Sequence, residues 1–354
     1  MPSYWPIRGI RDDTIRTRTI ENLIALREKL GREVRRYKSD GTVLLATWNI
    51  RDFDKNRFGY GKRLTESMHY IAEVVSSFDL VALQEVNRDT TGLEQLMKLL
   101  GPNWSYIMTD TTEGSGGNME RMAFVYDTRR VIFRNLAGEI VLPKKSRIGK
   151  ELQFARTPFL TGFQAGWFKM NLCSVHIYYG AASGEKLARR VEEIERLSKY
   201  FEKLQEKEAA NYILLGDFNI VSEDDATMNA LKAGGFRIPK PLRGHESNLK
   251  GTHMYDQIAI KEKDRIAEVT KAGVFRFDEV VFRDDPRDFE TYKSHLPKRH
   301  AKGKTGAELR DVYTKWRTWQ VSDHLPLWAC IKTDFTEDYL NSLKPDQAPL
   351  AMPD

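Results

Sequence analysis

The 354-residue sequence has few cysteines and no long apolar run. Cys173 and Cys330 are its only cysteines, which excludes a small fold held together by several disulfides. Each lies in an apolar run with strand character, so we expect two buried free thiols, with one disulfide as the alternative. No stretch reaches the length of a transmembrane helix, and the first residues lack the apolar segment of a signal peptide. We therefore expect a cytoplasmic protein without a membrane span.

A strong excess of one charge is also missing. The 56 basic and 50 acidic residues leave a formal net charge of +6, with a pI of about 9.0. The composition, 41% hydrophobic and 30% charged, is typical of a globular protein and excludes a disordered or fibrous one. The small positive balance favours an anionic partner, because a positive field concentrates phosphates and polyanions near the surface.

The periodicity of apolar residues divides the chain into three parts. Residues 1–40 form an N-terminal extension, in which apolar residues at helical spacing over residues 13–38 predict an amphipathic helix. From residue 42 onward, short apolar runs alternate with helical stretches such as residues 185–204, which predicts a mixed α/β domain over residues 41–333. Residues 334–354 are predicted to be a peripheral tail. The apolar positions of the first helix are Ile20, Leu23, Ile24, Leu30 and Val34.

Within the domain, residues 283–320 lack a long apolar run and are predicted to be a basic insertion or lid. Its basic side chains, together with Arg156, are candidates to neutralise phosphates, and its aromatic side chains are candidates to contact sugars or bases. The alternative is a solvated charged surface whose aromatic residues belong to the core. The candidates in the insertion are Lys298, Arg299, Lys302, Lys304, Lys315, Arg317, Tyr313, Trp316 and Trp319.

Polar residues capable of chemistry stand at the ends of six apolar runs. Four runs end just before the polar residue, and two begin with it. If the last two strands run opposite to the first four, all of these groups reach the same edge of the sheets. We therefore predict mixed or antiparallel sheets with one polar rim. The residues are Asn49, Glu85, His176 and Asp217, then Asp256 and the pair Asp323-His324.

Each of these segments has an ordinary structural explanation when taken alone. The turn at residues 216–219 (Gly-Asp-Phe-Asn) presents Asp217 and Asn219, but such a turn also caps helices. Glu85 supplies the oxygen ligand that Mg²⁺ prefers, although it could be an ordinary exposed carboxylate. Asp323 and His324 could serve a metal and a general base, or could simply end a strand. Their joint occurrence favours a single active site.

These segments resemble the ordered motifs of the endonuclease/exonuclease/phosphatase superfamily. The resemblance covers about residues 42–332. It implies an α+β fold, a four-layer α/β sandwich of two mixed or antiparallel sheets flanked by helices. It also implies a hydrolase of phosphoester bonds. The motifs lie at residues 47–50, 83–86, 216–219, 255–258 and 322–326.

Two further segments are similar to DNase I rather than to the abasic-site endonucleases. The strand that begins after Glu120 resembles the DNase I strand whose Glu orients a catalytic His, and His176 matches that His. The segment at residues 156–159 resembles the one that supplies a substrate-binding Arg, here Arg156. One departure is Asn118, in the glycine-rich loop 111–118, where DNase I has a groove-contacting Tyr. Asn118 thus becomes a substrate-binding candidate, and single-stranded DNA and RNA stay open as substrates.

The resemblance implies a role for each residue in the metal and base half of the site. Glu85 would hold Mg²⁺, with Mn²⁺ or Ca²⁺ as alternatives, and Asn49 and Asp323 would lie near the metal. His324, oriented by Asp256, would take a proton from the attacking water. A carboxylate partner fixes the tautomer of an imidazole and raises its pKa.

The other half of the site would donate the proton to the leaving oxygen. His176, oriented by Glu120, would be the general acid. Asp217 and Asn219 would position water and phosphate, and Asp217 is the alternative to His324 as the base.

The expected function is a DNase I-like endonuclease that acts on DNA, with RNA as an alternative, and that is a monomer. A second hypothesis keeps the catalytic core but gives it a lipid or small phosphoester. A third, of another class, is a catalytically inactive nucleic-acid-binding module, which the complete set of motifs disfavours.

Overall fold

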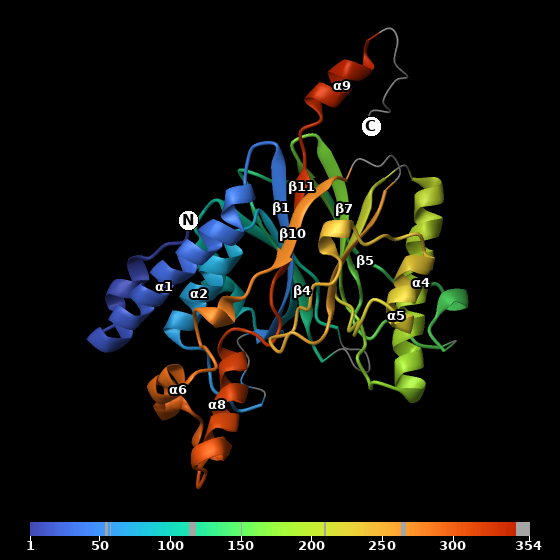
Figure 1. The fold of residues 1–354 in the computed structure, drawn as a ribbon. Helices are drawn as coiled ribbons and strands as arrows, with labels where there is room; N and C mark the ends of the chain where they lie inside the picture. Colours follow the sequence, from blue (N-terminus) through green and yellow to red (C-terminus); the bar gives the residue numbers. More distant parts are fainter. Residues whose placement is uncertain are drawn as a thin grey trace.

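The computed structural model describes residues 1–53, 56, 58–112, 118–149, 151–208, 210–262 and 267–344. Two β-sheets pack against each other, with helices on both outer sides (Figure 1). One sheet has six strands in the order β10-β11-β1-β2-β4-β3, and the other has five in the order β5-β6-β7-β8-β9. Each sheet is mixed, because β1 pairs parallel with β2 and β7 pairs parallel with β8, whereas the other pairs are antiparallel. The predicted four-layer sandwich is confirmed.

The strands of the six-stranded sheet are β1 (Thr42–Phe53), β2 (Leu80–Val86), β3 (Trp104–Met108), β4 (Arg121–Asp127), β10 (Val269–Val274) and β11 (Leu327–Lys332). Those of the five-stranded sheet are β5 (Ile132–Glu139), β6 (Phe159–Ala165), β7 (Phe168–His176), β8 (Tyr212–Asp217) and β9 (Asp256–Lys261). The α-helices are α1 (Asp13–Glu33), α2 (Thr65–Val75), α3 (Thr91–Leu100), α4 (Gly184–Lys207), α5 (Ala226–Ala233), α6 (Pro286–Tyr292), α7 (Lys298–Ala301), α8 (Gly306–Gln320) and α9 (Thr336–Ser342). In the described parts of the chain, no helix combines the length and the apolar character needed to cross a membrane.

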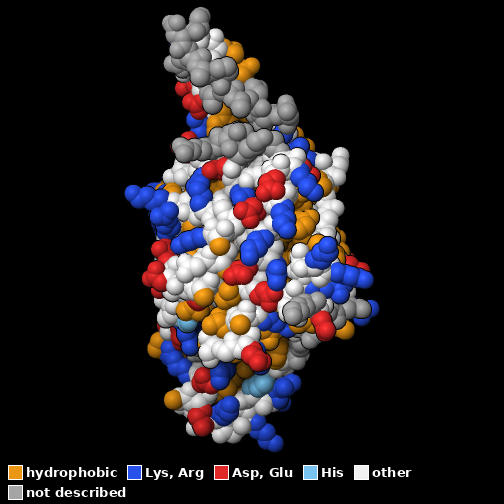
Figure 2. All heavy atoms as spheres, turned by 90° about the vertical axis from the view of Figure 1, so that its right-hand side faces the viewer, with side chains coloured by type: hydrophobic (Ala, Val, Ile, Leu, Met, Phe, Trp, Pro, Cys, Tyr) orange, Lys and Arg blue, Asp and Glu red, His pale blue; other side chains and the backbone are white. Residues whose placement is uncertain are grey.

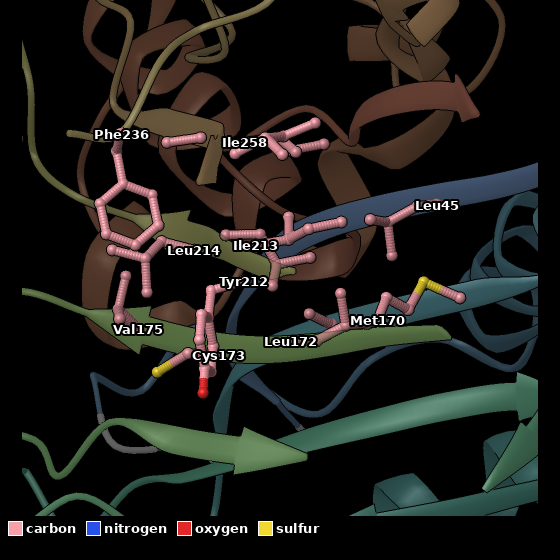
Figure 3. Close-up of a cluster of buried hydrophobic side chains, with 14 of the residues drawn as sticks. Leu45, Met170, Leu172, Cys173, Val175, Tyr212, Ile213, Leu214, Phe236 and Ile258 are labelled. Carbon is pink, nitrogen blue, oxygen red and sulfur yellow. The ribbon is translucent and has the colours of Figure 1, made fainter. Parts of the chain in front are cut away.

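Strand β1 shows why the sequence forms two hydrophobic layers. Successive side chains of a strand point to opposite faces of its sheet. Val43 and Leu45 belong to the core between the two sheets. Leu44 and Trp48 belong to the core between the six-stranded sheet and its helices. Figure 3 shows the inner layer, where Leu45 lies close to side chains of β7 and β8.

Both cysteines are buried and free, as predicted. The predicted helix at residues 185–204 is confirmed within α4, which covers the outer face of the five-stranded sheet with α5 (Figure 1). Of the predicted tail, the structure describes α9 and the chain as far as Lys344, and residues 345–354 lie outside the described part.

The N-terminal helix α1 packs beside α2 on the outer side of the six-stranded sheet (Figure 1). It begins where the side chain of Asp12 accepts a hydrogen bond from the backbone N–H of Ile15. The predicted apolar face is wrong at two positions, since Ile20 and Ile24 are 42% and 53% exposed. Apolar residues lie on two sides of this helix, and the contact with α2 decides which side is buried. The buried side consists of Leu23, Leu26, Leu30 and the adjoining Val34.

The region at residues 283–320 is helical and packs against the core. It forms α6, α7 and α8, and Tyr313 and Trp316 of α8 are 0% and 1% exposed. Arg317 is 9% exposed and donates a hydrogen bond to the carbonyl of Phe282. Tyr313 and Trp316 thus follow the alternative in which the aromatic residues belong to the core, and the prediction that these three side chains meet the substrate is wrong. The helical spacing along α8 turns them toward Phe282, Phe289 and Tyr292. Lys315 is ion-paired with Asp311.

Candidate active site

The polar residues at the strand ends meet at one edge of the two sheets, as predicted. Strand β9 runs antiparallel to β8, so that Asp256 pairs with Asp217, and the parallel pairing of β7 with β8 sets His176 beside Asp217. Strand β11 runs antiparallel to β1 and therefore begins where β1 carries Asn49. The opposite direction of the last two strands is what gathers these side chains.

Asp217 lies at the centre of this cluster and is 2% exposed. Its Oδ2 is 3.1 Å from Nδ2 of Asn49, 3.6 Å from Nε2 of His176 and 3.7 Å from Nε2 of His324. The preceding Gly216 has a φ of +141°, and a Cβ there would lie 2.0 Å from the carbonyl oxygen of Val175. Only glycine therefore allows β8 to approach β7 closely enough to place this carboxylate.

On one side of Asp217, the imidazole of His324 is held by Asp256. Nδ1 of His324 is 2.8 Å from Oδ2 of Asp256, which is fully buried and accepts a second hydrogen bond from Oγ of Ser247 at 2.6 Å. Burial lowers the pKa of His324, but the negative charges of Asp256 and Asp217 outweigh this effect and set the pKa well above its ordinary value. Because Nδ1 faces Asp256, Nε2 is the nitrogen directed at the centre of the cluster.

On the other side, His176 is held by Glu120. Nδ1 of His176 lies 2.9 Å from Oε2 of Glu120, and both residues are buried. The guanidinium of Arg156 binds the same carboxylate through Nε at 2.7 Å and Nη2 at 3.2 Å. Burial alone would raise the pKa of Glu120, but His176 and Arg156 lower it to about 2. Arg156, predicted to bind substrate, is 9% exposed and has Glu120 as its ionic partner.

Glu85 provides the best-placed carboxylate for a metal ion. It has a φ of +60°, and its Oε1 and Oε2 accept hydrogen bonds from Nδ2 of Asn49 at 2.8 Å and from the backbone N–H of Asp52 at 2.7 Å. Burial and the nearby Glu120 raise the pKa of Glu85. A partly buried carboxylate beside other carboxylates is stabilised as an anion by a divalent cation, so the residues present fit such an ion.

The other two predicted metal residues take part in protein contacts. Asp323 lies 2.9 Å from Nη1 of Arg51, and Oδ1 of Asn49 accepts the backbone N–H of Arg51 at 3.0 Å. In the described residues, no group of three or more His, Cys, Asp or Glu side chains has the spacing to hold a metal ion. Mg²⁺ needs fewer protein ligands than that, because it keeps several of its water molecules.

The two asparagines predicted to meet substrate are placed differently. Asn219 is 6% exposed and has a φ of +54°; its backbone N–H binds Oδ1 of Asp217 at 2.9 Å, and its Nδ2 donates to the carbonyl of Ile177 at 2.9 Å. Asn118 is exposed, with a φ of +56°, two residues before Glu120. Residues 113–117 of the glycine-rich loop lie outside the described part of the chain.

Comparison with known proteins decides the family. The model of the endonuclease/exonuclease/phosphatase family matches residues 46–324, which is most of the chain. The chain belongs to the endonuclease/exonuclease/phosphatase family. This supports a hydrolase that acts on phosphoester bonds.

Individual relatives agree with this assignment. A protein of Thioalkalivibrio sp. named deoxyribonuclease is 28% identical over 276 residues, covering 72% of this chain and 69% of that protein. The human Nocturnin catalytic domain has a similar fold, with a TM-score of 0.53, 13% identity, and coverage of 82% of this chain and 94% of that one. A family protein from Bacteroides thetaiotaomicron has a TM-score of 0.51 at 17% identity, covering 83% and 98% of the two chains.

Two buried polar residues missed by the sequence analysis connect the family motifs. Oγ of Ser322 donates to the carbonyl of Asn49 at 2.6 Å and accepts the backbone N–H of His324 at 3.0 Å, so it joins the metal and base residues. Nε2 of Gln84 donates to Oγ of Ser174 at 3.0 Å, which ties the two sheets together just below Glu85. Both residues stand inside the motifs, at residues 83–86 and 322–326, and that position was the only signal for them.

Arg51, also missed, is the link between the site and the helical insertion. It has a φ of +50° in a bulge of β1, where the register with β2 shifts between Asn49 and Phe53. Its guanidinium lies 4.1 Å from the ring centroid of Trp319 on α8 and pairs with Asp323. Of the aromatic candidates in the insertion, Trp319 thus supports the site through Arg51.

Proposed function

We propose that this protein is a Mg²⁺-dependent phosphodiesterase that hydrolyses DNA as an endonuclease. The observation that carries the proposal is the arrangement of two imidazoles around Asp217. His176 and His324 each have Nδ1 against a buried carboxylate, and each directs Nε2 at Oδ2 of Asp217, at 3.6 and 3.7 Å. Such a pair can serve as acid and base on opposite sides of one phosphate.

In this proposal His324 is the general base. Its Nε2 takes a proton from the attacking water, and Asp256 stabilises the resulting imidazolium at Nδ1. Asp217 orients the water through its contacts with both imidazoles. Asp217 is itself within 3.7 Å of His324, so it is the alternative acceptor of the proton.

His176 is the proposed general acid. It acts in its protonated form. The ionised Glu120, whose Oε2 lies 2.9 Å from Nδ1 of His176, stabilises that form. Nε2 then releases a proton to the departing oxygen. Arg156 keeps Glu120 ionised and fixed, so in this proposal it acts through Glu120. Its Nε and Nη2 bind that carboxylate, and a direct contact of Arg156 with phosphate would therefore use Nη1.

A divalent ion held by Glu85, with Asn49 and Asp323 beside it, would withdraw negative charge from a non-bridging phosphate oxygen. Glu85 contributes a partly buried anionic oxygen pair that Asn49 and Asp52 hold in place. The donor set consists of oxygen atoms, which suits Mg²⁺ better than a softer metal.

Two observations support DNA as the substrate. The curated relative of Thioalkalivibrio is named a deoxyribonuclease. The basic residues of the insertion, Lys298, Arg299, Lys302 and Lys304, are exposed in the region that packs next to the site through α8. On the face over α4, basic and acidic side chains are intermixed (Figure 2), so that face offers no continuous basic path for a polyanion.

The test is cleavage by purified protein of supercoiled plasmid, linear duplex, single-stranded DNA and RNA, each with Mg²⁺ or with EDTA. We expect nicking and linearisation of the plasmid with Mg²⁺ and none with EDTA. His324→Ala is the control variant and should be slower by about 10²- to 10⁴-fold. Cleavage of RNA alone would move the proposal to that substrate. No cleavage of any nucleic acid, together with hydrolysis of a small phosphoester such as p-nitrophenyl phosphate, would refute the nuclease assignment.

A further inference from the structure

Helix α4 carries two fully buried charged side chains that the proposed reaction does not use. Arg190 and Glu193 are 0% and 1% exposed, and their spacing puts them on the same face of the helix. A buried charge is unfavourable unless hydrogen bonds or an opposite charge compensate it. Their partners therefore indicate why the helix keeps them.

Arg190 binds main-chain carbonyl groups that follow β7 and β8. Nε and Nη2 donate to the carbonyl of Tyr179, Nη2 also donates to that of Ala181, and Nη1 donates to that of Asn219 at 2.8 Å. No carboxylate of the described residues lies within salt-bridge distance of this guanidinium, and burial lowers the pKa of Arg190. The side chain thus joins the loop after His176 to the turn that contains Asn219.

Glu193, one turn further along, binds backbone N–H groups in the same loop after His176 and in the segment that precedes β6. Oε1 accepts the N–H of Ala155 at 3.1 Å, and Oε2 accepts the N–H of Tyr178 at 3.1 Å. Ala155 directly precedes Arg156, and Tyr178 stands two residues after His176. The carboxylate therefore fixes both ends of the row of side chains that runs from Arg156 through Glu120 to His176.

We propose that Arg190 and Glu193 are positioning residues that set the relative places of His176, Arg156 and Asn219, an inference that rests on the proposed phosphodiesterase function. The helix is a rigid element, and each of its two charges joins two segments that lie just outside the paired parts of β6, β7 and β8. Misplacement of a catalytic group by about 1 Å can lower a rate by about 10²-fold. Holding the loops from one helix keeps the acid close to Asp217.

The first test is Glu193→Gln, with Glu195→Gln as the matched control. Glu195 lies on the same helix, is half-buried and has no hydrogen bond or ion pair in the described structure. The carboxamide introduced by Glu193→Gln keeps one acceptor oxygen and sets an NH₂ against the other backbone N–H, so one loop is released. We expect kcat to fall by about 10- to 100-fold while KM changes by less than about twofold, because the groups that hold the phosphate stay in place.

A second pair of variants covers the case in which Glu193→Gln does not fold. Arg190→Lys keeps the charge but replaces the planar fork with a single donor nitrogen, which cannot reach all three carbonyl groups. Arg196→Lys, on the surface of the same helix and paired with Glu192, is its control. We expect a lower kcat for Arg190→Lys alone. Equal kcat values within each pair of variant and control would overturn the inference.

A spectroscopic readout separates this inference from the proposed function. The Nδ1 proton of His176, close to Glu120, is expected to give a downfield NMR resonance in the wild-type protein. Glu193→Gln and Arg190→Lys should shift or broaden it, and their controls should not. If the wild type cleaves no phosphodiester, the proposed function fails, and the resonance still decides the positioning role. An unchanged resonance in both variants would refute that role.

Discussion

Replacement of Asp256 by Asn is the most direct test of the proposed base. Asp256 is fully buried, and its Oδ2 holds Nδ1 of His324 at 2.8 Å while also accepting the hydroxyl of Ser247. Asn has nearly the same shape, so the variant should fold. It removes the negative charge that stabilises the imidazolium, and its NH₂ can face Nδ1, which would place the ring proton on the wrong nitrogen.

The expected loss follows from these contacts. A hydrogen bond to a charged group contributes about 1.5–3 kcal/mol, and about 1.4 kcal/mol corresponds to a tenfold change in rate. Loss of the charge alone should therefore lower kcat by about 10- to 150-fold. The wrong tautomer adds to this, as in serine-protease triads, where Asp→Asn lowers kcat by about 10⁴-fold. We expect a decrease between about 10²- and 10⁴-fold.

The assay is the pH dependence of kcat for Mg²⁺-dependent plasmid cleavage. A general base acts in its neutral form, so activity should rise with pH through the raised pKa of His324. Asp256→Asn removes one of the anions that raise this pKa, and the rising limb should move to lower pH. Ser247→Ala is the control, because it removes one hydrogen bond but keeps the charge, and it should cost about tenfold or less. An unchanged rising limb in Asp256→Asn would refute the role of Asp256.

Three further predictions concern the metal, the acid and the core. Glu85→Gln should raise the Mg²⁺ concentration needed for half-maximal activity, and an unchanged Mg²⁺ titration would contradict its role as a ligand. Glu120 has a pKa depressed to about 2, so its ionisation stabilises the fold above its ordinary pKa of 4.5, and this stability is lost as pH falls from about 4.5 to about 2. In chemical unfolding, the free energy of unfolding of Glu120→Gln should therefore fall less between pH 4.5 and about 2 than that of the wild type. Parallel curves of this free energy against pH would contradict the ion pair. Trp316→Ala should lower the free energy of unfolding by about 3–5 kcal/mol, because the indole is buried against Phe282 and Tyr292, whereas loss of a solvent-facing indole would cost little.

The residues of the site could be predicted from the sequence, whereas the helices beside it could not. Asn49, Glu85, His176, Asp217 and His324 could be recognised because each ends or begins a strongly apolar run, and a strand end is a local property of the sequence. The helices of residues 283–320 were not recognised. The buried residues of α8 include the polar Arg317 and Gln320 and are interrupted by charged ones such as Lys315, so no long apolar run marks the helix in the sequence.

The residues that hold the site residues in place could not be predicted from the sequence either. Ser247, Arg190 and Glu193 act on groups that are distant in the sequence or that belong to the main chain, such as the carbonyl of Asn219 and the N–H of Ala155. No local pattern marks such contacts. Likewise, Arg156 matched a substrate-binding segment, yet the structure pairs it with Glu120.

The sequence by itself determined which residues stand at the ends of the strands and what chemistry they can perform. Apolar runs and turn-forming glycines are local features, because each depends on only a few neighbouring positions. The tertiary structure decided how these residues meet. Antiparallel placement of β9 and β11 brings Asp256 and His324 to the same edge as Asn49, Glu85 and Asp217. Packing also decided which face of α1 and α8 is buried and which charged groups hold the loops, because burial and pairing of charges depend on neighbours that only the folded chain supplies.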